Sequence, residues 1–268
     1  MANTASARIA DLKPGDGYVQ SFARGLEVIR SFSAKAPSQT LTEVAGRAGL
    51  SRAGARRILL TLEALGYVRS DGKLFSLSPR ILDLGFSYLS SMPIWNLAEP
   101  VMEALVAQVH ESSSAAVLDG TDIVYVLRVP TRKIMSISLG VGSRLPAYCT
   151  SMGRMLLSAL AQDDLMALLR ASDLAARTKT TLTDAKEIAA KVAQARRQGW
   201  SLVNQELEEG LISLAAPIVD RSGQMVAALN ISGQANRTSA RVMQDTMLEP
   251  LLEAARTISR QLDGTTVA

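Results

Sequence analysis

The stretch LTEVAGRAGLSRAGARRILLTLEALGYV, from Leu41 to Val68, holds two short segments with apolar residues at helical spacing, separated at Gly49-Leu50. Thr42 is expected to cap the first helix and Gly49 to end it, while Ser51 is expected to cap the second. The second helix, ended by Gly66, has an apolar stripe made of Ala55, Ile58, Leu59, Leu62 and Leu65. A helix-turn-helix is therefore predicted over about residues 41–60.

The flanking residues extend this motif on both sides. Before it, Phe22, Leu26, Ile29 and Phe32 recur at spacings of three and four, which predicts an amphipathic helix. After it, two short strands, Val68–Ser70 and Leu74–Leu77, are expected around an Asp71-Gly72 turn. Residues 18–78 therefore form a predicted winged helix-turn-helix.

The outer surface of the second helix of the motif is basic and slim. Three arginines crowd its first two turns, with Ala53 and Gly54 between them. A helix that enters the major groove needs long donors there, and arginine can bond guanine with two of them. The wing cations would contact phosphates. The predicted DNA-binding residues are Thr42, Ser51, Arg52, Arg56, Arg57, Arg69 and Lys73.

A competing interpretation is a small α+β domain whose basic helix face is merely solvated. Charge distribution favours DNA: residues 18–79 hold nine Lys and Arg against four Asp and Glu, whereas residues 80–268 hold 18 against 19. The basic excess therefore belongs to the first quarter of the chain, as expected for a module that meets a polyanion.

Composition limits the remaining possibilities. The chain of 268 residues is long enough for two domains, and no apolar run approaches the length of a membrane span. Residues 1–17 are polar and are expected to be a disordered lead-in rather than a signal peptide. One cysteine and one histidine argue against disulfides and against a His/Cys metal site. We therefore expect a cytoplasmic protein without cofactor or metal, and no association with membranes.

Residues 79–93 are expected to form a linker helix that starts at Ser78-Pro79 and pairs with its copy from a second chain. Gly85 weakens this helix, and Pro93 marks the expected boundary. Residues 94–268 then alternate helical and strand patterns. Strands are expected in 114–129 as a hairpin turning near Gly120, and in 133–139, 200–206, 212–220 and 224–232. Helices are expected in 96–111, 151–160, 184–200 and 239–262. This pattern predicts an α+β sensor-like domain.

Residues Gly142–Leu160, GSRLPAYCTSMGRMLLSAL, contain a Gly- and Pro-rich loop that runs into a helix at Thr150-Ser151. The free N–H groups of such a helix start favour an anion, although a plain capped helix gives the same pattern. Ser213, Asn230 and Ser232 are polar groups in otherwise apolar strands. They indicate a small-molecule pocket, unless each hydroxyl is simply bonded to backbone.

The order of a basic winged helix-turn-helix, a linker helix and the segments GSRLPAYCTSMGR and APIVDRSGQMVAALNISG resembles the IclR family of bacterial transcriptional regulators. The similarity covers nearly everything from Tyr18 to Leu262. YVQSFARGLEVIRSF and IMSISLGVGSRLPAYCTSMGRMLLSAL are similar to the PcaR/PcaU/PobR subgroup, which regulates aromatic-acid catabolism.

This resemblance implies a GAF-like effector domain, a homodimer or tetramer, and a palindromic operator in double-stranded DNA. It implies a carboxylate effector such as β-ketoadipate, protocatechuate or 4-hydroxybenzoate, held by main-chain N–H groups near Ser151 and Met152. The implied pocket walls are Ile137, Leu145 and Tyr148, and the implied strand contacts are Ser213, Asn230 and Ser232. Val203 and Ser213 depart from the acid-and-cysteine version of the family, and Arg144 is a candidate for a second carboxylate or an ordinary exposed arginine.

Two other classes of protein compete with a ligand-responsive regulator that does no chemistry. In the first, an enzyme, Cys149 would be a nucleophile activated by a helix start, with His110 as its base. Against it, no third residue near Cys149 in sequence orients a base, and a lone cysteine is commonly buried packing. The second is an architectural DNA-binding protein whose operator affinity ignores small acids.

Overall fold

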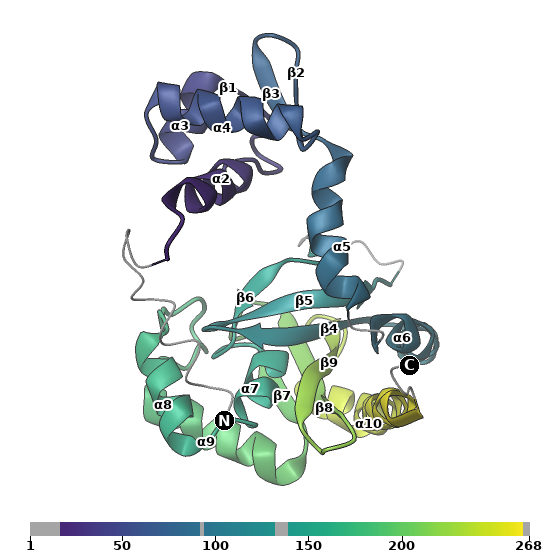
Figure 1. Cartoon of the computed structure of the whole chain (residues 1–268). Coiled ribbons are helices and arrows are strands. Elements are labelled where there is room, and N and C mark those ends of the chain that lie inside the picture. Colours follow the sequence, from purple (N-terminus) through teal and green to yellow (C-terminus); the bar gives the residue numbers. More distant parts are fainter. Residues whose placement is uncertain (1–16, 92–93, 132–138, 265–268) are drawn as a thin grey trace. The chain divides into compact units, whose positions relative to one another are not determined.

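The computed structural model describes residues 17–91, 94–131 and 139–264. The chain divides into two compact units, Met1–Ser91 and Met92–Ala268. Figure 1 shows a small unit of helices with a short sheet, and a larger unit built on a single long sheet. The predicted α+β class, with an N-terminal winged helix-turn-helix, is confirmed.

The first unit contains every predicted element and one more. Its elements are α2 (Gln20–Arg30), β1 (Ser38–Thr40), α3 (Leu41–Arg47), α4 (Arg52–Ala64), β2 (Val68–Ser70), β3 (Leu74–Leu77), a 3-10 turn η1 (Pro79–Ile81) and α5 (Leu82–Ser90). The sequence did not predict β1, which pairs with β3 and makes the wing a three-stranded sheet in the order β1-β3-β2. The buried Gln39 anchors β1, since its Nε2 donates to the Ser31 carbonyl at 3.0 Å.

The caps of the two motif helices differ in how well they were predicted. Ser51 caps α4, as expected, by accepting from the Gly54 N–H at 3.1 Å. Thr42 does not cap α3. The cap is Thr40, whose side chain accepts from the Glu43 N–H, while the Glu43 carboxylate accepts from the Thr40 N–H at 2.8 Å. This reciprocal pair satisfies two N–H groups at once, which a cap two residues later would not.

The core of the first unit is the buried cluster of Val28, Phe32, Val44, Leu59, Leu62 and Val68. Two expectations about it were wrong. Leu65, the last residue of the predicted stripe, is 53% exposed, because α4 has ended and the chain turns at Gly66 with φ +81°. In the predicted stripe of α2, Phe22 is 68% exposed and Leu26 is 38% exposed, because α2 turns the side that carries Val28 toward the core.

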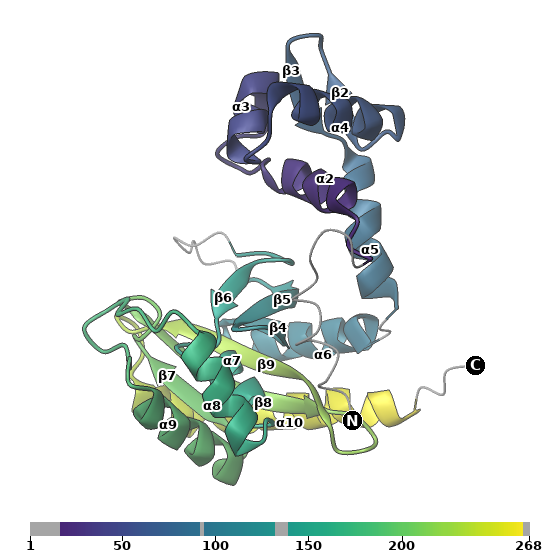
Figure 2. The same cartoon turned by 60° about the vertical axis from the view of Figure 1, so that its left-hand side comes forward.

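The second unit is a six-stranded antiparallel sheet in the order β6-β5-β4-β9-β8-β7. Its strands are β4 (Ser112–Asp119), β5 (Asp122–Val129), β6 (Arg144–Pro146), β7 (Ser201–Asn204), β8 (Leu211–Val219) and β9 (Met225–Gln234). Its helices are α6 (Ile94–Val109), α7 (Ser151–Leu157), α8 (Gln162–Ala171), α9 (Ala185–Gln198) and α10 (Ala240–Gly264). Figure 2 shows α6 and α10 on one face of the sheet and α7, α8 and α9 on the other.

Most elements of this unit were predicted, including the hairpin at Gly120, whose φ is +61°. Strand β6 and helix α8 were not predicted. The strand expected in 133–139 falls almost entirely on residues outside the described ranges, as does Ile137, and Pro93 is also outside them. The segment expected to be a linker helix holds the η1 turn followed by α5, and no residue of either is buried. Among the described residues, no helix is long and apolar enough to cross a membrane.

Candidate functional sites: a basic helix and an uncharged cavity

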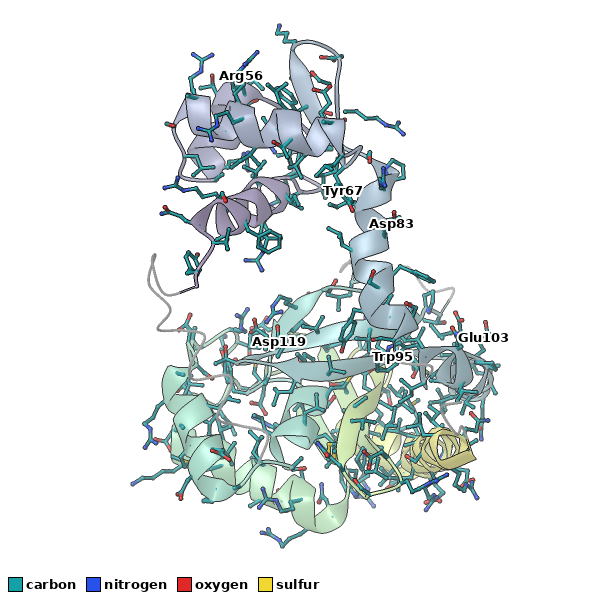
Figure 3. All side chains as sticks on the ribbon, viewed as in Figure 1. Arg56, Tyr67, Asp83, Trp95, Glu103 and Asp119 are labelled. Atoms are coloured by element: carbon teal, nitrogen blue, oxygen red, sulfur yellow. The ribbon has the colours of Figure 1, made fainter. Side chains whose placement is uncertain are left out.

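The arginines of α4 form an exposed basic surface. Arg52, Arg56 and Arg57 all reach solvent, while Ala55 and Leu59 on the opposite side are buried. None of the three arginines is in an ion pair with a residue that the structure describes, and Figure 3 shows Arg56 pointing away from the unit. Their donors are therefore free to bind an external anion. Thr42 and Ser51 are also exposed, at the starts of α3 and α4.

The wing presents the other two predicted cations. Arg69 on β2 and Lys73 in the turn before β3 are both exposed. Asp71 shapes this turn, as its Oδ1 accepts from the N–H groups of Leu74 at 2.7 Å and Lys73 at 2.9 Å. The same two bonds lower the pKa of Asp71. Asp71 is thus occupied in holding the turn, which leaves the lysine side chain available to a phosphate.

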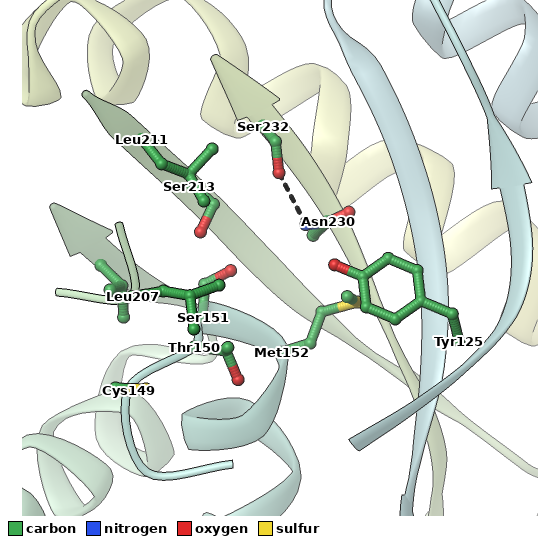
Figure 4. Close-up of a pocket in the computed structure, with 11 residues that line it drawn as sticks. Tyr125, Cys149, Thr150, Ser151, Met152, Leu207, Leu211, Ser213, Asn230 and Ser232 are labelled. Carbon is green, nitrogen blue, oxygen red and sulfur yellow. Dashed lines mark hydrogen bonds between the residues drawn. The ribbon is translucent and has the colours of Figure 1, made fainter. Parts of the chain in front are cut away.

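A small cavity lies in the second unit between the start of α7 and the sheet (Figure 4). Its volume is about 20 Å³, which is room for about one water molecule. The lining residues come from β5, α7, β7, β8 and β9 and from the loops before α7 and β8: Tyr125, Cys149, Thr150, Ser151, Met152, Val203, Leu207, Leu211, Ser213, Asn230 and Ser232.

The first turn of α7 supplies main-chain donors to this cavity. Thr150 caps the helix by accepting from the Gly153 N–H at 3.1 Å, and its hydroxyl donates to the Pro146 carbonyl at 3.0 Å. Ser151 and Met152 occupy the first two helical positions, where an N–H has no acceptor within the helix. The Ser151 hydroxyl is buried and has no hydrogen-bond partner among the described residues. A carboxylate at this end of the cavity would satisfy these donors.

The sheet contributes a polar network to the opposite side. Asn230 Oδ1 accepts from the Ser114 N–H at 2.9 Å, and its Nδ2 donates to the Ser232 hydroxyl at 2.9 Å. This fixes the orientation of the amide and leaves the Ser232 proton free to be donated. In Figure 4 the Tyr125 hydroxyl points into the cavity beside Asn230. The cavity therefore offers hydroxyl and amide groups on its sheet side.

The predicted effector residues divide between the cavity and its surroundings. Five of them line it: Ser151, Met152, Ser213, Asn230 and Ser232. Leu145 packs against the neighbouring core, and the Tyr148 hydroxyl instead donates to the Ala175 carbonyl at 2.5 Å. Sequence reasoning missed Tyr125, Leu207 and Leu211. Of these, only Tyr125 carried a signal, as a hydroxyl within the apolar strand DIVYVLRV.

A buried ion pair joins two segments that contribute residues to the cavity lining. Arg154 of α7 donates through its two terminal nitrogens to Glu206 at 2.6 and 2.5 Å, and through Nε to the Tyr148 carbonyl at 3.1 Å. Glu206 also accepts from the Leu182 N–H at 3.2 Å. The pair joins the helix that supplies the main-chain donors to the segment that carries Leu207. Arg144, by contrast, is exposed and paired with Asp119 and Asp122.

The thiol of Cys149 is fully buried, and burial raises its pKa to about 11. The competing enzyme interpretation needs a lowered pKa here, but desolvation outweighs the nearby Arg177 and Arg154 and raises it instead. His110 is exposed at the end of α6, with no hydrogen bond to Cys149 among the described residues. The geometry of a Cys–His nucleophile is thus not present. Residues 17–91, 94–131 and 139–264 also contain no His, Cys, Asp and Glu grouping suited to a metal ion.

We expect Cys149 to react slowly with iodoacetamide. Because burial raises the pKa of the thiol from 9.0 to about 11, its thiolate fraction at pH 8 falls about 100-fold, and burial also limits access of the reagent. Labelling of the native protein should be at least 100-fold slower than in urea, and should accelerate as the pH rises toward 11. The chain has a single cysteine, so mass spectrometry reports this site alone. Rapid labelling at neutral pH would contradict the structure.

Comparison with known proteins covers both units. Residues 21–72 match the IclR helix-turn-helix domain, and residues 86–260 match the family described as bacterial transcriptional regulator IclR C-terminal. The chain is 44% identical to the Pca regulon regulatory protein of Pseudomonas putida, over 92% of this chain and 85% of that protein. It is 34% identical to the p-hydroxybenzoate hydroxylase transcriptional activator of Acinetobacter baylyi, over 88% and 89% of the two chains.

A solved structure extends the similarity to three dimensions. An IclR homolog from Microbacterium hydrocarbonoxydans, crystallised with 4-hydroxybenzoate, superposes with a TM-score of 0.81 at 25% identity. The alignment covers 91% of this chain and all of that one.

Proposed function

The chain belongs to the IclR family of bacterial transcriptional regulators, and from this premise we propose that it controls genes of aromatic-acid catabolism in response to a small carboxylic acid. The observation that carries the DNA-binding half is the exposed, unpaired arginine cluster of α4. Arg52, Arg56 and Arg57 would read base edges in the major groove, and Arg69 and Lys73 would contact phosphates. The names of two relatives, one a Pca regulator and one an activator for p-hydroxybenzoate hydroxylase, support the choice of pathway.

The proposed effector site is the cavity at the start of α7. A carboxylate there would accept from the N–H groups of Ser151 and Met152 and from the orphan Ser151 hydroxyl. The free space fits about one water molecule, so an acid of the size of 4-hydroxybenzoate must displace lining side chains. Leu207 lies in the loop before β8, and Leu211 is the first residue of β8. We propose that these two side chains move when the acid binds. Binding would then be coupled to a change in conformation.

Regulation follows if that change alters operator affinity. We propose a homodimer or tetramer on a palindromic operator, with two arrangements of the DNA-binding units in equilibrium. The acid shifts this equilibrium only by its difference in affinity for the two arrangements. The apolar side chains that α5 exposes, Leu82, Leu84, Phe86 and Tyr88, suit pairing with a second copy. Residues 18–78, 79–93 and 94–268 would then serve as DNA-binding, linker and effector-binding parts.

We expect Arg56→Ala and Arg57→Ala each to weaken operator binding by about 5- to 150-fold, because one good bidentate arginine–guanine contact is worth about 1–3 kcal/mol. The measurement is fluorescence anisotropy with promoter fragments from the protein's own locus, at fixed salt. Arg170→Ala, which removes an exposed arginine at the end of α8, is the control for net charge and should bind as the wild type does. Wild-type affinity in both α4 variants would overturn the assignment of the recognition helix.

A further inference from the structure

The cavity described above is lined entirely by uncharged side chains among the described residues. Tyr125, Thr150, Ser151, Ser213, Asn230 and Ser232 are its polar members, and the others are apolar or the Cys149 thiol. Val203 of β7 is one of the apolar members. One carboxylate can be accommodated by the main-chain donors of α7. A second would have no cation within the described lining.

Arg154 is a buried cation of α7, and its donors are already in use. Both terminal nitrogens bind Glu206, and Nε binds the Tyr148 carbonyl. The carboxylate of Glu206 neutralises the guanidinium, so the pair offers no net charge to a ligand. Arg144, the other candidate for a second carboxylate, is exposed and does not line the cavity. Arg128 and Arg177, whose charges act on Tyr125 and Cys149, do not line the cavity.

Tyr125 supplies a neutral group on the sheet side. Its side chain is buried, and its hydroxyl has no hydrogen-bond partner among the described residues, although it points into the cavity (Figure 4). Burial raises its pKa to about 12, which keeps the hydroxyl protonated at neutral pH. Beside it, Asn230 holds the Ser232 hydroxyl as an acceptor. Tyr125 and Ser232 therefore both have protons to donate to an uncharged oxygen.

We propose that the cavity selects acids that carry one carboxylate and an uncharged hydrogen-bonding group at the far end, with Tyr125 as the residue that reads this group. Dicarboxylates are excluded, because burying an unpaired carboxylate costs far more than burying a satisfied hydroxyl. This inference rests on the proposed function of the cavity as the effector site. It favours hydroxybenzoate-like acids over β-ketoadipate.

The test is calorimetry on the full-length protein with pairs of acids that differ in one group, either a second carboxylate or a hydroxyl. Terephthalate and 4-carbamoylbenzoate have nearly the same shape, but only the first carries a second carboxylate. We expect 4-carbamoylbenzoate to bind at least tenfold more tightly than terephthalate, and 4-hydroxybenzoate at least tenfold more tightly than benzoate or β-ketoadipate. Tyr125→Phe should reduce the preference for 4-hydroxybenzoate over benzoate to about twofold or less.

Tyr148→Phe is the matched control, since it removes a buried phenolic hydroxyl that binds Ala175 and does not line the cavity. It should keep the wild-type preference. The inference is overturned if the dicarboxylates bind as tightly as the monocarboxylates, or if the two tyrosine variants lose the preference equally. In both cases the proposed function stands as long as some acid alters operator binding. If no acid binds, and operator binding is indifferent to all of them, the inference and the effector half of the proposed function fail together.

Discussion

Replacement of Gly153 by alanine is expected to destabilise the second unit by about 3 kcal/mol, the upper part of the range for overpacked cores. A Cβ on Gly153 would lie 2.1 Å from the Ala147 carbonyl oxygen and 2.4 Å from the Ala147 Cα. Both are backbone atoms of the loop that folds over the first turn of α7, so no side chain can rotate aside. The loop must move, and the Thr150 cap would be strained with it, because its Oγ1 would be 2.5 Å from the new atom.

Both tryptophans, Trp95 and Trp200, belong to the second unit, so urea unfolding followed by their fluorescence reports on it alone. The control is Gly85→Ala in α5, where an added Cβ meets nothing within 4 Å. That change should leave the fluorescence transition in place and favour the helix by up to about 1 kcal/mol. If Gly153→Ala unfolded at the same urea concentration as the wild type, the close approach of loop and helix would be wrong.

Local signals were sufficient to predict most of the first unit. The caps, the glycines with positive φ and the apolar stripes all act within a few residues, which is why Ser51, Gly66 and the two wing strands were placed correctly. Strand β1 was missed since its three residues, Ser-Gln-Thr, have no apolar alternation. It exists because β3 offers it an edge and Gln39 binds back to Ser31, contacts that sequence spacing cannot reveal.

Only part of the cavity lining could be predicted, because some of its residues come together only in the folded sheet. Ser213, Asn230 and Ser232 stand out as polar residues in apolar strands, and the start of α7 is visible as a cap after a Pro-containing loop. Tyr125 joins them only through the sheet order, in which β4 lies between β5 and β9. Conversely, Tyr148 is next to the site in sequence, yet its hydroxyl turns to Ala175. Tyr148 was assigned to the site because it is close to it in the sequence, whereas Tyr125 was missed because it is far from the other site residues in the sequence.

The ion pair of Arg154 and Glu206 was also not predicted, since 52 residues separate its members. We expect Arg154→Met to destabilise the second unit by about 3–5 kcal/mol, the cost of leaving one member of a buried pair without its partner. Glu206 would keep only the Leu182 N–H as a donor while its carboxylate remains largely buried. Urea unfolding with tryptophan fluorescence again provides the measurement. Arg144→Met, which removes an exposed arginine from two ion pairs in the same unit, should cost less than about 1 kcal/mol.

The double variant Arg154→Met/Glu206→Leu separates loss of charge pairing from loss of packing. With both charges gone, no ion is left buried, and replacement of a buried pair by apolar residues is often neutral. The double variant should therefore recover most of the stability that Arg154→Met alone loses, giving a coupling of more than about 1 kcal/mol in a double-mutant cycle. The Tyr148 carbonyl would still lack its Nε donor, so recovery should be incomplete. Additive losses in the cycle, or equal losses for Arg154→Met and Arg144→Met, would mean that this pair is no more than a surface contact.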